Sequence, residues 1–356
     1  MQEKSSFTSF VASWFQRNFS DPEITSLLVT LLLAVVVLEC FGRLLTPILI
    51  SVVFAYLLLS GVRFLKRMHF PRLIAVWLIF LVFLAVIGLA LFFLLPALWK
   101  QLSNLSKQLP SLVNHGVTWF NYLKTSYPNL LTNINSDSML VNFQTQISSL
   151  GQWLFSYSLT SIAGIIEFIL YFILVPVMAF FFLKDSAIIT KWMTRFLPTH
   201  RSVLDRVWKE VNQQIGNYVR GRVIEIVVVG VVSVAVFSVL NLQYALLLGA
   251  LVGVSVIVPY VGAIVVTIPI VAIALFQWGM SIQFVYLMIA YAVIIILDAN
   301  VLVPILFAET MDLHPIVIII SVLFFGGIWG FWGVFFAIPL ATVIKAVINV
   351  WPKRAH

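Results

Sequence analysis

The sequence of 356 residues contains few charged side chains and almost no cysteine. Charged residues make up 10% of the chain, whereas soluble domains carry about 25%. The single cysteine, Cys40, excludes an intramolecular disulfide and a zinc cluster built on thiolates. Since hydrophobic residues reach 62%, a soluble globular protein is excluded and an integral membrane protein is favoured.

Sequence motifs of enzymes are also missing. There is no HExxH zinc motif and no phosphate-binding loop. The stretches from Gly253 to Val256 and from Gly279 to Ile282 lack the trailing glycine of an intramembrane serine protease motif. His314 has no second metal ligand nearby and precedes a proline, which indicates a turn residue. We therefore expect no catalytic residues, no bound metal and no cofactor.

Basic residues outnumber acidic ones by 21 to 13, which gives a net charge of +8. They gather in two short hydrophilic loops and in the C-terminal tail, so the positive-inside rule explains them better than nucleic-acid binding does. Both loops and both termini are therefore expected in the cytoplasm. A cleavable signal is not expected, because the N-terminus carries polar and acidic residues without a small-residue cleavage site.

Repeated long apolar runs predict an all-α polytopic membrane protein with about five to six full spans. Two helical hairpins broken by proline and glycine, and an extracytoplasmic helical segment, complete the prediction. The expected segments are an amphipathic lead with three spans (1–96; spans at about 24–41, 44–65 and 73–95), the extracytoplasmic segment (97–156), a fourth span (157–183), cytoplasmic amphipathic helices (184–222), a transport core (223–350) and a basic tail (351–356).

Two of these segments carry a helical stripe of apolar residues. Leucines recur every three or four residues from Leu98 to Leu112, so the segment after Pro96 contains an amphipathic helix. That helix is either a packing cap over the bundle or a lid or oligomer contact. A second stripe, from Leu204 to Tyr218, belongs to a helix that we expect to continue unbroken into a span over 223–240.

The predicted hairpins cover about 245–276 and 315–350, with a span over 282–306 between them. Both end in a Gly-apolar-Ile-Pro pattern, and matching interrupted segments in a transporter point to a binding site. Two hairpins also return the basic tail to the cytoplasm, as the charge rule requires. The residues expected to break helices are Pro259, Gly262, Pro269, Pro304, Gly326, Gly327, Gly330, Gly333 and Pro339.

Three carboxylates lie within predicted spans, where an ionised group costs at least about 2.5–3.5 kcal/mol. Asp298 has apolar runs on both sides and lies near the expected break at Pro304. Glu225 lies three residues after Arg222, and Glu167 is deep in the fourth span. Structural alternatives remain open: Asp298 as a helix cap, Glu225 as an interfacial ion pair, and Glu167 with a buried partner elsewhere.

Our hypothesis is that Asp298, Asn300 and Glu225, with Glu167 as a further candidate, line a polar pathway between the two hairpins. Such a cavity would bind a small polar solute or exchange protons for cations, because protonation removes the cost of burying a carboxylate. The expected partners are the lipid bilayer, that solute or ion, and further copies of the chain, but not nucleic acid.

Several stretches together resemble a known family. They are the run from Trp208 to Gln214, Arg220-Gly221 with Glu225, the VPYVGAIVVTIP turn, Asn300 with Pro304, Leu313-His314-Pro315 and the GGIWGFWG ending. They resemble the autoinducer-2 exporter family, and within it the PerM-type permeases most closely, over nearly the whole chain. The resemblance implies an oligomeric multi-pass permease of the bacterial inner membrane. Some members export autoinducer-2, and others are described as sodium/proton antiporters.

This chain departs from the family pattern after Pro304. Ala308 and Glu309 stand where a glycine and a basic residue are usual, which changes the local charge beside the expected site. The substrate of relatives is therefore not carried over. An oligomeric channel-like pore and a membrane scaffold without transport activity remain alternatives to a secondary permease.

Overall fold

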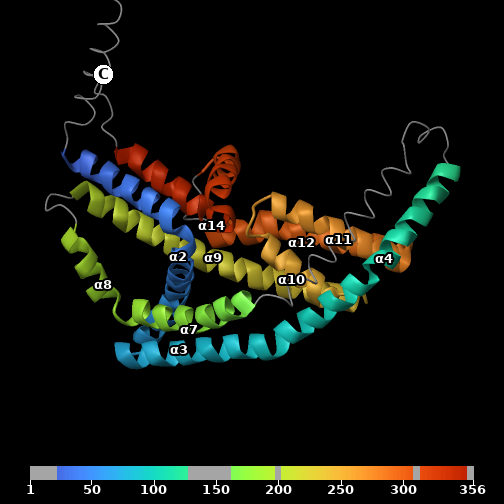
Figure 1. Cartoon of the computed structure of the whole chain (residues 1–356), viewed down its shortest axis with the longest axis horizontal. Coiled ribbons are helices and arrows are strands. Elements are labelled where there is room, and N and C mark those ends of the chain that lie inside the picture. Colours follow the sequence, from blue (N-terminus) through green and yellow to red (C-terminus); the bar gives the residue numbers. More distant parts are fainter. Residues whose placement is uncertain (1–21, 127–161, 197–201, 308–312, 351–356) are drawn as a thin grey trace, which may run out of the picture. The chain divides into compact units, whose positions relative to one another are not determined.

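The computed structural model describes residues 22–126, 162–196, 202–307 and 313–350. Within these ranges every regular element is a helix (Figure 1), which confirms the predicted all-α class. The amphipathic lead, the second half of the predicted extracytoplasmic segment, Glu309 and the basic tail lie outside the described residues.

Six helical stretches in the described part of the chain are long and apolar enough to cross a membrane. They are Leu44–Arg67, Arg72–Ser111, Leu204–Val239, Val261–Trp278, Ile282–Phe307 and Pro315–Val347. A bent pair, Phe168–Lys184 and Ser186–Met193, meets at 83° and raises the number to seven if it forms one span. These stretches confirm a polytopic membrane protein.

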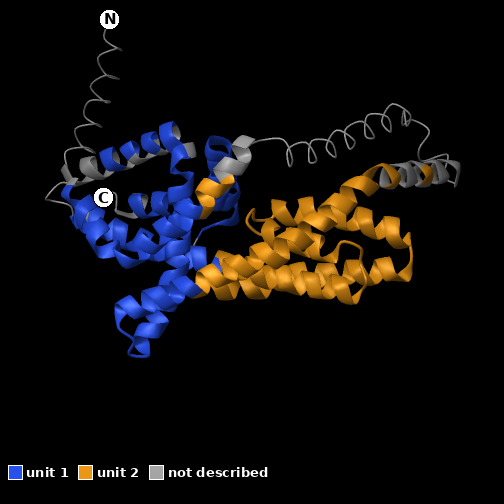
Figure 2. Cartoon of the chain, turned by 60° about the horizontal axis from the view of Figure 1, so that its bottom comes forward, with its two compact units in different colours: residues 1–81, 173–221, 307–356 blue, residues 82–172, 222–306 orange. Residues whose placement is uncertain are grey.

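The chain divides into two compact units, each built from separate stretches of sequence (Figure 2). Unit 1 contains Met1–Leu81, Ile173–Gly221 and Phe307–His356. Unit 2 contains Val82–Phe172 and Arg222–Leu306. The two predicted hairpins thus belong to different units.

In unit 1, helix α2 (Pro22–Arg67) replaces the two spans predicted over 24–41 and 44–65. The predicted separation into two spans is therefore not observed, although Leu44–Arg67 within this helix is a candidate span, close to the predicted 44–65. Pro47 removes only one backbone hydrogen bond, and the Thr46 hydroxyl donates to the Gly42 carbonyl, so the helix bends rather than ends (Figure 1). At 46 residues α2 is about 69 Å long, more than a bilayer core can hold.

Unit 1 also contains the end of helix α7 (Ile162–Lys184), helix α8 (Ser186–Met193), a short 3₁₀ turn (Thr194–Phe196), the start of helix α9 (Ser202–Val239) and helix α14 (Pro315–Val350). The fourth span was expected to end at Lys184-Asp185, and α7 ends there. The predicted continuity of α9 from its amphipathic start into an apolar span is confirmed.

Helix α3 (Arg72–Leu89), which belongs to unit 2 from Val82 onward, continues through a π-helical turn (Ala90–Leu94) into helix α4 (Leu95–Ser126). The third span was expected to end at Pro96, and this prediction was wrong. The Leu95 N–H donates to the carbonyl of Ala90, five residues earlier. The wider turn accommodates the proline ring, which would clash with the preceding turn of a regular α-helix.

Helix α4 packs against the first hairpin through its half-buried leucine face. Gln108 accepts a hydrogen bond from the Tyr244 hydroxyl at 2.7 Å, and Gln101 accepts one from the Leu247 N–H at 2.9 Å. Leu105 packs on the core formed by helices α9, α10, α11 and α12. These contacts favour the packing role over the lid role for the described part of this segment.

That core is formed by α9, α10 (Ala245–Ser255), α11 (Val261–Trp278) and α12 (Ile282–Leu297). Phe237, Leu248 and Ile270 are fully buried within it. Small residues bring α9 and α10 together, since a Cβ atom on Gly253 would lie 2.6 Å from the Ile226 carbonyl oxygen. This close contact fixes α10, which is too short to span a membrane by itself.

The first hairpin reverses between Ser255 and Val261, as the sequence predicts. Tyr260 takes a positive φ of 63°, which is uncommon for a residue other than glycine. At Gly262 the returning helix touches the chain it has just left, since a Cβ there would lie 1.7 Å from the Ser255 carbonyl oxygen. The second break expected near Pro269 is absent, and α11 continues through the proline to Trp278. In the preceding turn, Thr267 and Tyr291 both donate to the Ala263 carbonyl.

The second hairpin is formed by α14, whose helical backbone is interrupted at Gly330 with φ 58° and ψ −132°. Gly333 has the role that Gly262 has in the first hairpin, because a Cβ there would lie 1.8 Å from the Phe325 carbonyl oxygen. Gly326 is close to Val334, whereas a Cβ on Gly327 would meet nothing within 4 Å. Pro339 was expected to break the chain, but the helix continues through it.

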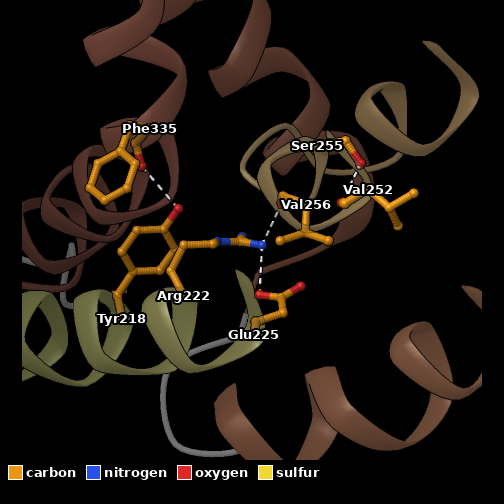
Figure 3. Close-up of polar contacts among 7 residues, drawn as sticks. All are labelled: Tyr218, Arg222, Glu225, Val252, Ser255, Val256 and Phe335. Carbon is orange, nitrogen blue, oxygen red and sulfur yellow. Dashed lines mark hydrogen bonds and ion pairs between the residues drawn. The ribbon is translucent and has the colours of Figure 1, made fainter. Parts of the chain in front are cut away.

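Pro339 remains in the helix because another residue replaces its missing donor. A proline leaves the carbonyl four residues earlier without its helical partner, and here that carbonyl belongs to Phe335. The Tyr218 hydroxyl, on α9 in the same unit, donates to this oxygen at 2.9 Å (Figure 3). Tyr218 is only 2% exposed, so the bond is shielded from water.

Candidate functional site

Helix α9 brings a buried ion pair into unit 2. Arg222 and Glu225 are three residues apart, which places them on one face of the helix. Their Nη1 and Oε2 atoms are 2.8 Å apart, and the two side chains are 3% and 2% exposed (Figure 3). The interfacial ion pair considered for Glu225 is therefore present, but it is buried within the helices of unit 2.

Arg222 also binds the broken end of the first hairpin. Its Nη1 donates to the Val256 carbonyl oxygen at 2.7 Å (Figure 3). Val256 follows the last residue of α10, where helical carbonyls lack their usual donors and carry the negative end of the helix dipole. The guanidinium therefore joins a carboxylate on α9 to the reversal between α10 and α11.

Asp298 lies at the end of α12, where a π-helical turn (Asp298–Leu302) precedes helix α13 (Val303–Phe307). The break expected at Pro304 is thus a wide turn, and the helix continues through the proline to Phe307. The Val303 N–H donates to the Asp298 carbonyl, as Leu95 does to Ala90 before Pro96. Single π turns occur often at functional sites.

The Asp298 side chain is half-buried, and its Oδ1 atom is inaccessible and has no hydrogen-bond partner among the described residues. Its charge interacts with those of Arg222 and Glu225. Arg222, Glu225 and Asp298 are called the polar cluster below. With all three groups ionised, the cluster carries one positive and two negative charges.

Of the other predicted site residues, only the side chain of Asn300 is described, and it does not join the polar cluster. Asn300 is exposed, and its Nδ2 donates to the Ile296 carbonyl of its own helix at 2.8 Å, which satisfies backbone beside the π turn. Glu167 lies in α7, but its side chain is outside the described part of the structure. Among the residues that the structure describes, no group of three His, Cys, Asp or Glu side chains could hold a metal ion.

Sequence analysis missed the backbone part of this site and the role of Tyr218. The Val256 carbonyl could have been found, because a hairpin broken at Pro259 and Gly262 must leave carbonyls free at the end of its first helix. Tyr218 was assigned only to an apolar stripe. Its hydroxyl had a signal too, since Pro339 frees the Phe335 carbonyl and a buried carbonyl requires a donor.

Comparison with known proteins agrees with this membrane architecture. The model of the AI-2E family transporter matches residues 24–353. "Putative permease PerM" of Escherichia coli K12 is 44% identical over 339 residues, covering 95% of this chain and 96% of the relative. "Putative transport protein YrrI" of Bacillus subtilis is 26% identical over 313 residues, covering 85% of each chain. A "Putative transport protein" of Thermotoga maritima is 23% identical over 332 residues, covering 93% and 95%.

The relatives named above carry the printed names "putative permease" and "putative transport protein", which points to a transporter rather than an enzyme. This chain is a multi-pass membrane protein that belongs to the AI-2E transporter family.

Proposed function

We propose that this chain is a secondary permease that uses the polar cluster to move a small polar solute, autoinducer-2-like in size and polarity, or to exchange a cation for protons across the inner membrane. The observation that carries the proposal is the Asp298 Oδ1 atom. This atom is buried and has no hydrogen-bond partner among the described residues. The charge of the Asp298 carboxylate interacts with that of Arg222, which forms a buried ion pair with Glu225.

The charge balance of the polar cluster suits exchange. One guanidinium can neutralise one carboxylate, so two ionised carboxylates leave a formal charge of −1 in a site of low polarity. A proton, a monovalent cation or the donor groups of a polar solute would each offset that charge. Because one compensating charge neutralises the cluster, binding of one of these species opposes binding of another, and this competition is the basis of antiport.

The broken hairpin supplies the second requirement of a transport site, a backbone that can change with occupancy. Arg222 holds the Val256 carbonyl and Glu225 with the same nitrogen, Nη1. A proton or cation that weakens the bond to Glu225 therefore changes the restraint on the end of α10. Transporters of other families aim interrupted helices at substrates in this way.

The test is flux into proteoliposomes for autoinducer-2, sodium and protons, with wild type, Asp298→Asn and Glu210→Gln. Glu210 is the matched control, since it is an exposed carboxylate on α9 outside the polar cluster. We expect Asp298→Asn to lower flux at least about 10-fold and to remove its pH dependence, because a buried amide cannot exchange a proton. Glu210→Gln should transport like wild type.

Unchanged and still pH-dependent flux in Asp298→Asn would reject the role of the polar cluster. Single-channel currents without saturation would replace the permease by a pore. An absence of flux for every solute and ion, with folded protein in the vesicles, would favour a scaffold without transport activity.

A further inference from the structure

Unit 1 contains a cavity that the polar cluster does not use. Its volume is about 580 Å³, within the range of about 300–1,000 Å³ that is usual for small-molecule sites. Its walls come from α2, the start of α9 and the second hairpin, and all of its lining residues belong to unit 1. Aromatic rings dominate the walls, among them Trp208, Trp329, Trp332 and Phe336.

The hydroxyl groups in these walls already have partners. Thr46 and Tyr56 carry the hydroxyls among the lining residues. The Thr46 hydroxyl donates to the Gly42 carbonyl, and the Tyr56 hydroxyl donates to Asn212 Oδ1. Most of the wall therefore offers an occupant hydrocarbon and aromatic surface, which favours an apolar guest over a polar solute.

The Trp208 side chain lies at one end of the cavity. Trp208 lines it, yet the residue is 56% exposed, which places its indole at the mouth. Indole N–H groups are typical donors to lipid at the edge of a bilayer, where one end of the ring is wet and the other apolar. Exposed Arg206 and Lys209 flank Trp208 in sequence, and cationic side chains suit a lipid phosphate.

The location of the walls favours the same guest. The α2, α9 and α14 residues that line the cavity, apart from Gly42, belong to the candidate membrane spans Leu44–Arg67, Leu204–Val239 and Pro315–Val347. Acyl chains surround such helices in a bilayer, and an apolar wall favours an acyl chain over a polar guest. From these observations we propose that the unit 1 cavity binds one acyl chain of a membrane phospholipid, whose headgroup lies beside Trp208.

A glycine offers a way to fill the cavity with little disturbance. Gly42 lines it, and a Cβ atom there would meet nothing within 4 Å. Gly88 provides the matched control, because a Cβ there also meets nothing within 4 Å and Gly88 is not among the lining residues. Both glycines are helical, so Gly42→Leu and Gly88→Leu make the same chemical change, and only the first enters the cavity.

The experiment reconstitutes each full-length variant into vesicles of phosphatidylethanolamine and phosphatidylglycerol that contain a phospholipid with a diazirine on its acyl chain. Photolysis, digestion and mass spectrometry then locate the label. We expect label on residues 328–343 and on Trp208 in wild type and in Gly88→Leu, with at least a 5-fold loss in Gly42→Leu. Phospholipid that remains bound after detergent purification should fall by one molecule per chain in Gly42→Leu only.

Equal labelling of all three proteins would overturn the proposal. A wild-type protein without label on the cavity residues would also overturn it. A crosslink from these residues to a second copy of the chain would overturn it too, because it would show that protein fills the cavity. Recovery of a free fatty acid in place of a phospholipid would overturn the headgroup part. The wild-type labelling pattern requires no variant, so poor folding of Gly42→Leu cannot decide the result.

Discussion

Single residues compensate for the interruptions in this protein, and Tyr218 is the clearest case. Pro339 removes a backbone donor inside α14, and the phenol of Tyr218 supplies the hydrogen bond that the Phe335 carbonyl would otherwise lack. A buried carbonyl without a partner costs about 1–3 kcal/mol. The tyrosine thus compensates for the proline, although 121 positions of sequence separate the two residues.

The first prediction concerns this pair. Tyr218→Phe should lower the free energy of unfolding by about 1–3 kcal/mol, because it leaves the Phe335 carbonyl buried without a donor. Pro339→Ala restores a backbone N–H four residues after Phe335, so the double variant Tyr218→Phe/Pro339→Ala should regain most of the loss. Denaturant unfolding in detergent measures all three variants. Additive losses in the double variant would contradict the explanation, since coupled residues must give an interaction energy.

At the residue scale, the two carboxylates of the polar cluster were singled out from the sequence, but the direction of the Asn300 side chain was not predicted. Asp298 and Glu225 stood out because ionised groups are rare in apolar runs, and the structure brings both to Arg222. Asn300 was chosen as an amide in an otherwise apolar run, yet this amide bonds to its own helix. A polar residue in an apolar run is visible in the sequence, but the direction of its side chain is not. Their roles in transport stay predictions.

At the scale of helices and turns, proline and glycine have different effects in this chain. The helical backbone continues through Pro47, Pro269 and Pro339, and Pro96 and Pro304 each follow a π turn. The reversals occur where glycine permits close backbone contact, at Gly262 and Gly333. Proline removes one hydrogen bond, which neighbours in a membrane protein can replace. For this reason the hairpins were predicted correctly, but Pro96, Pro269, Pro304 and Pro339 were wrongly expected to end or break helices.

The second prediction tests the glycine of the first hairpin. Gly262→Ala places a methyl group 1.7 Å from the Ser255 carbonyl oxygen, and backbone cannot rotate away as a side chain can. We expect a loss of at least about 3 kcal/mol in unfolding free energy, the upper end for overpacked sites. Thermal and denaturant unfolding of the purified protein would measure it.

The control for that prediction is Gly327→Ala in the second hairpin. A Cβ at Gly327 meets nothing within 4 Å, and its backbone is helical. Alanine there should change stability by no more than about 1 kcal/mol, in the stabilising direction that helix propensity gives. Equal effects of the two substitutions would mean that the contact between Gly262 and Ser255 does not determine the fold of the hairpin.

At the scale of the whole molecule, the membrane architecture was predicted from composition, and the grouping of its parts was not. Apolar runs separated by basic loops are enough to predict a polytopic helical protein. The two compact units each combine distant stretches of sequence, which no local pattern encodes. The oligomer expected from the resemblance to the family, and the pocket expected between the hairpins, stay predictions.

The third prediction concerns orientation in the membrane. Lys66 lies at the end of α2 in a basic loop expected in the cytoplasm, and Lys107 lies in α4 on the side expected outside. From Arg72 to Lys107 the chain is helical throughout. This stretch advances 35 residues at about 1.5 Å each, so it is about 53 Å long, whereas a hydrocarbon core is about 30 Å thick. We therefore expect the two ends of this stretch to lie at opposite faces of the bilayer.

Single cysteines on a Cys40→Ser background test this orientation in spheroplasts. Cys40 is exposed, so the parent variant without added cysteine must give no signal with a membrane-impermeant maleimide. We expect Lys107→Cys to react in intact spheroplasts and Lys66→Cys to react only after permeabilisation, because basic loops remain on the cytoplasmic side during insertion. Reaction of both cysteines in intact spheroplasts would mean that the long helix does not cross the membrane. The reverse pattern would place the N-terminal basic loop outside and would contradict the charge rule for this chain.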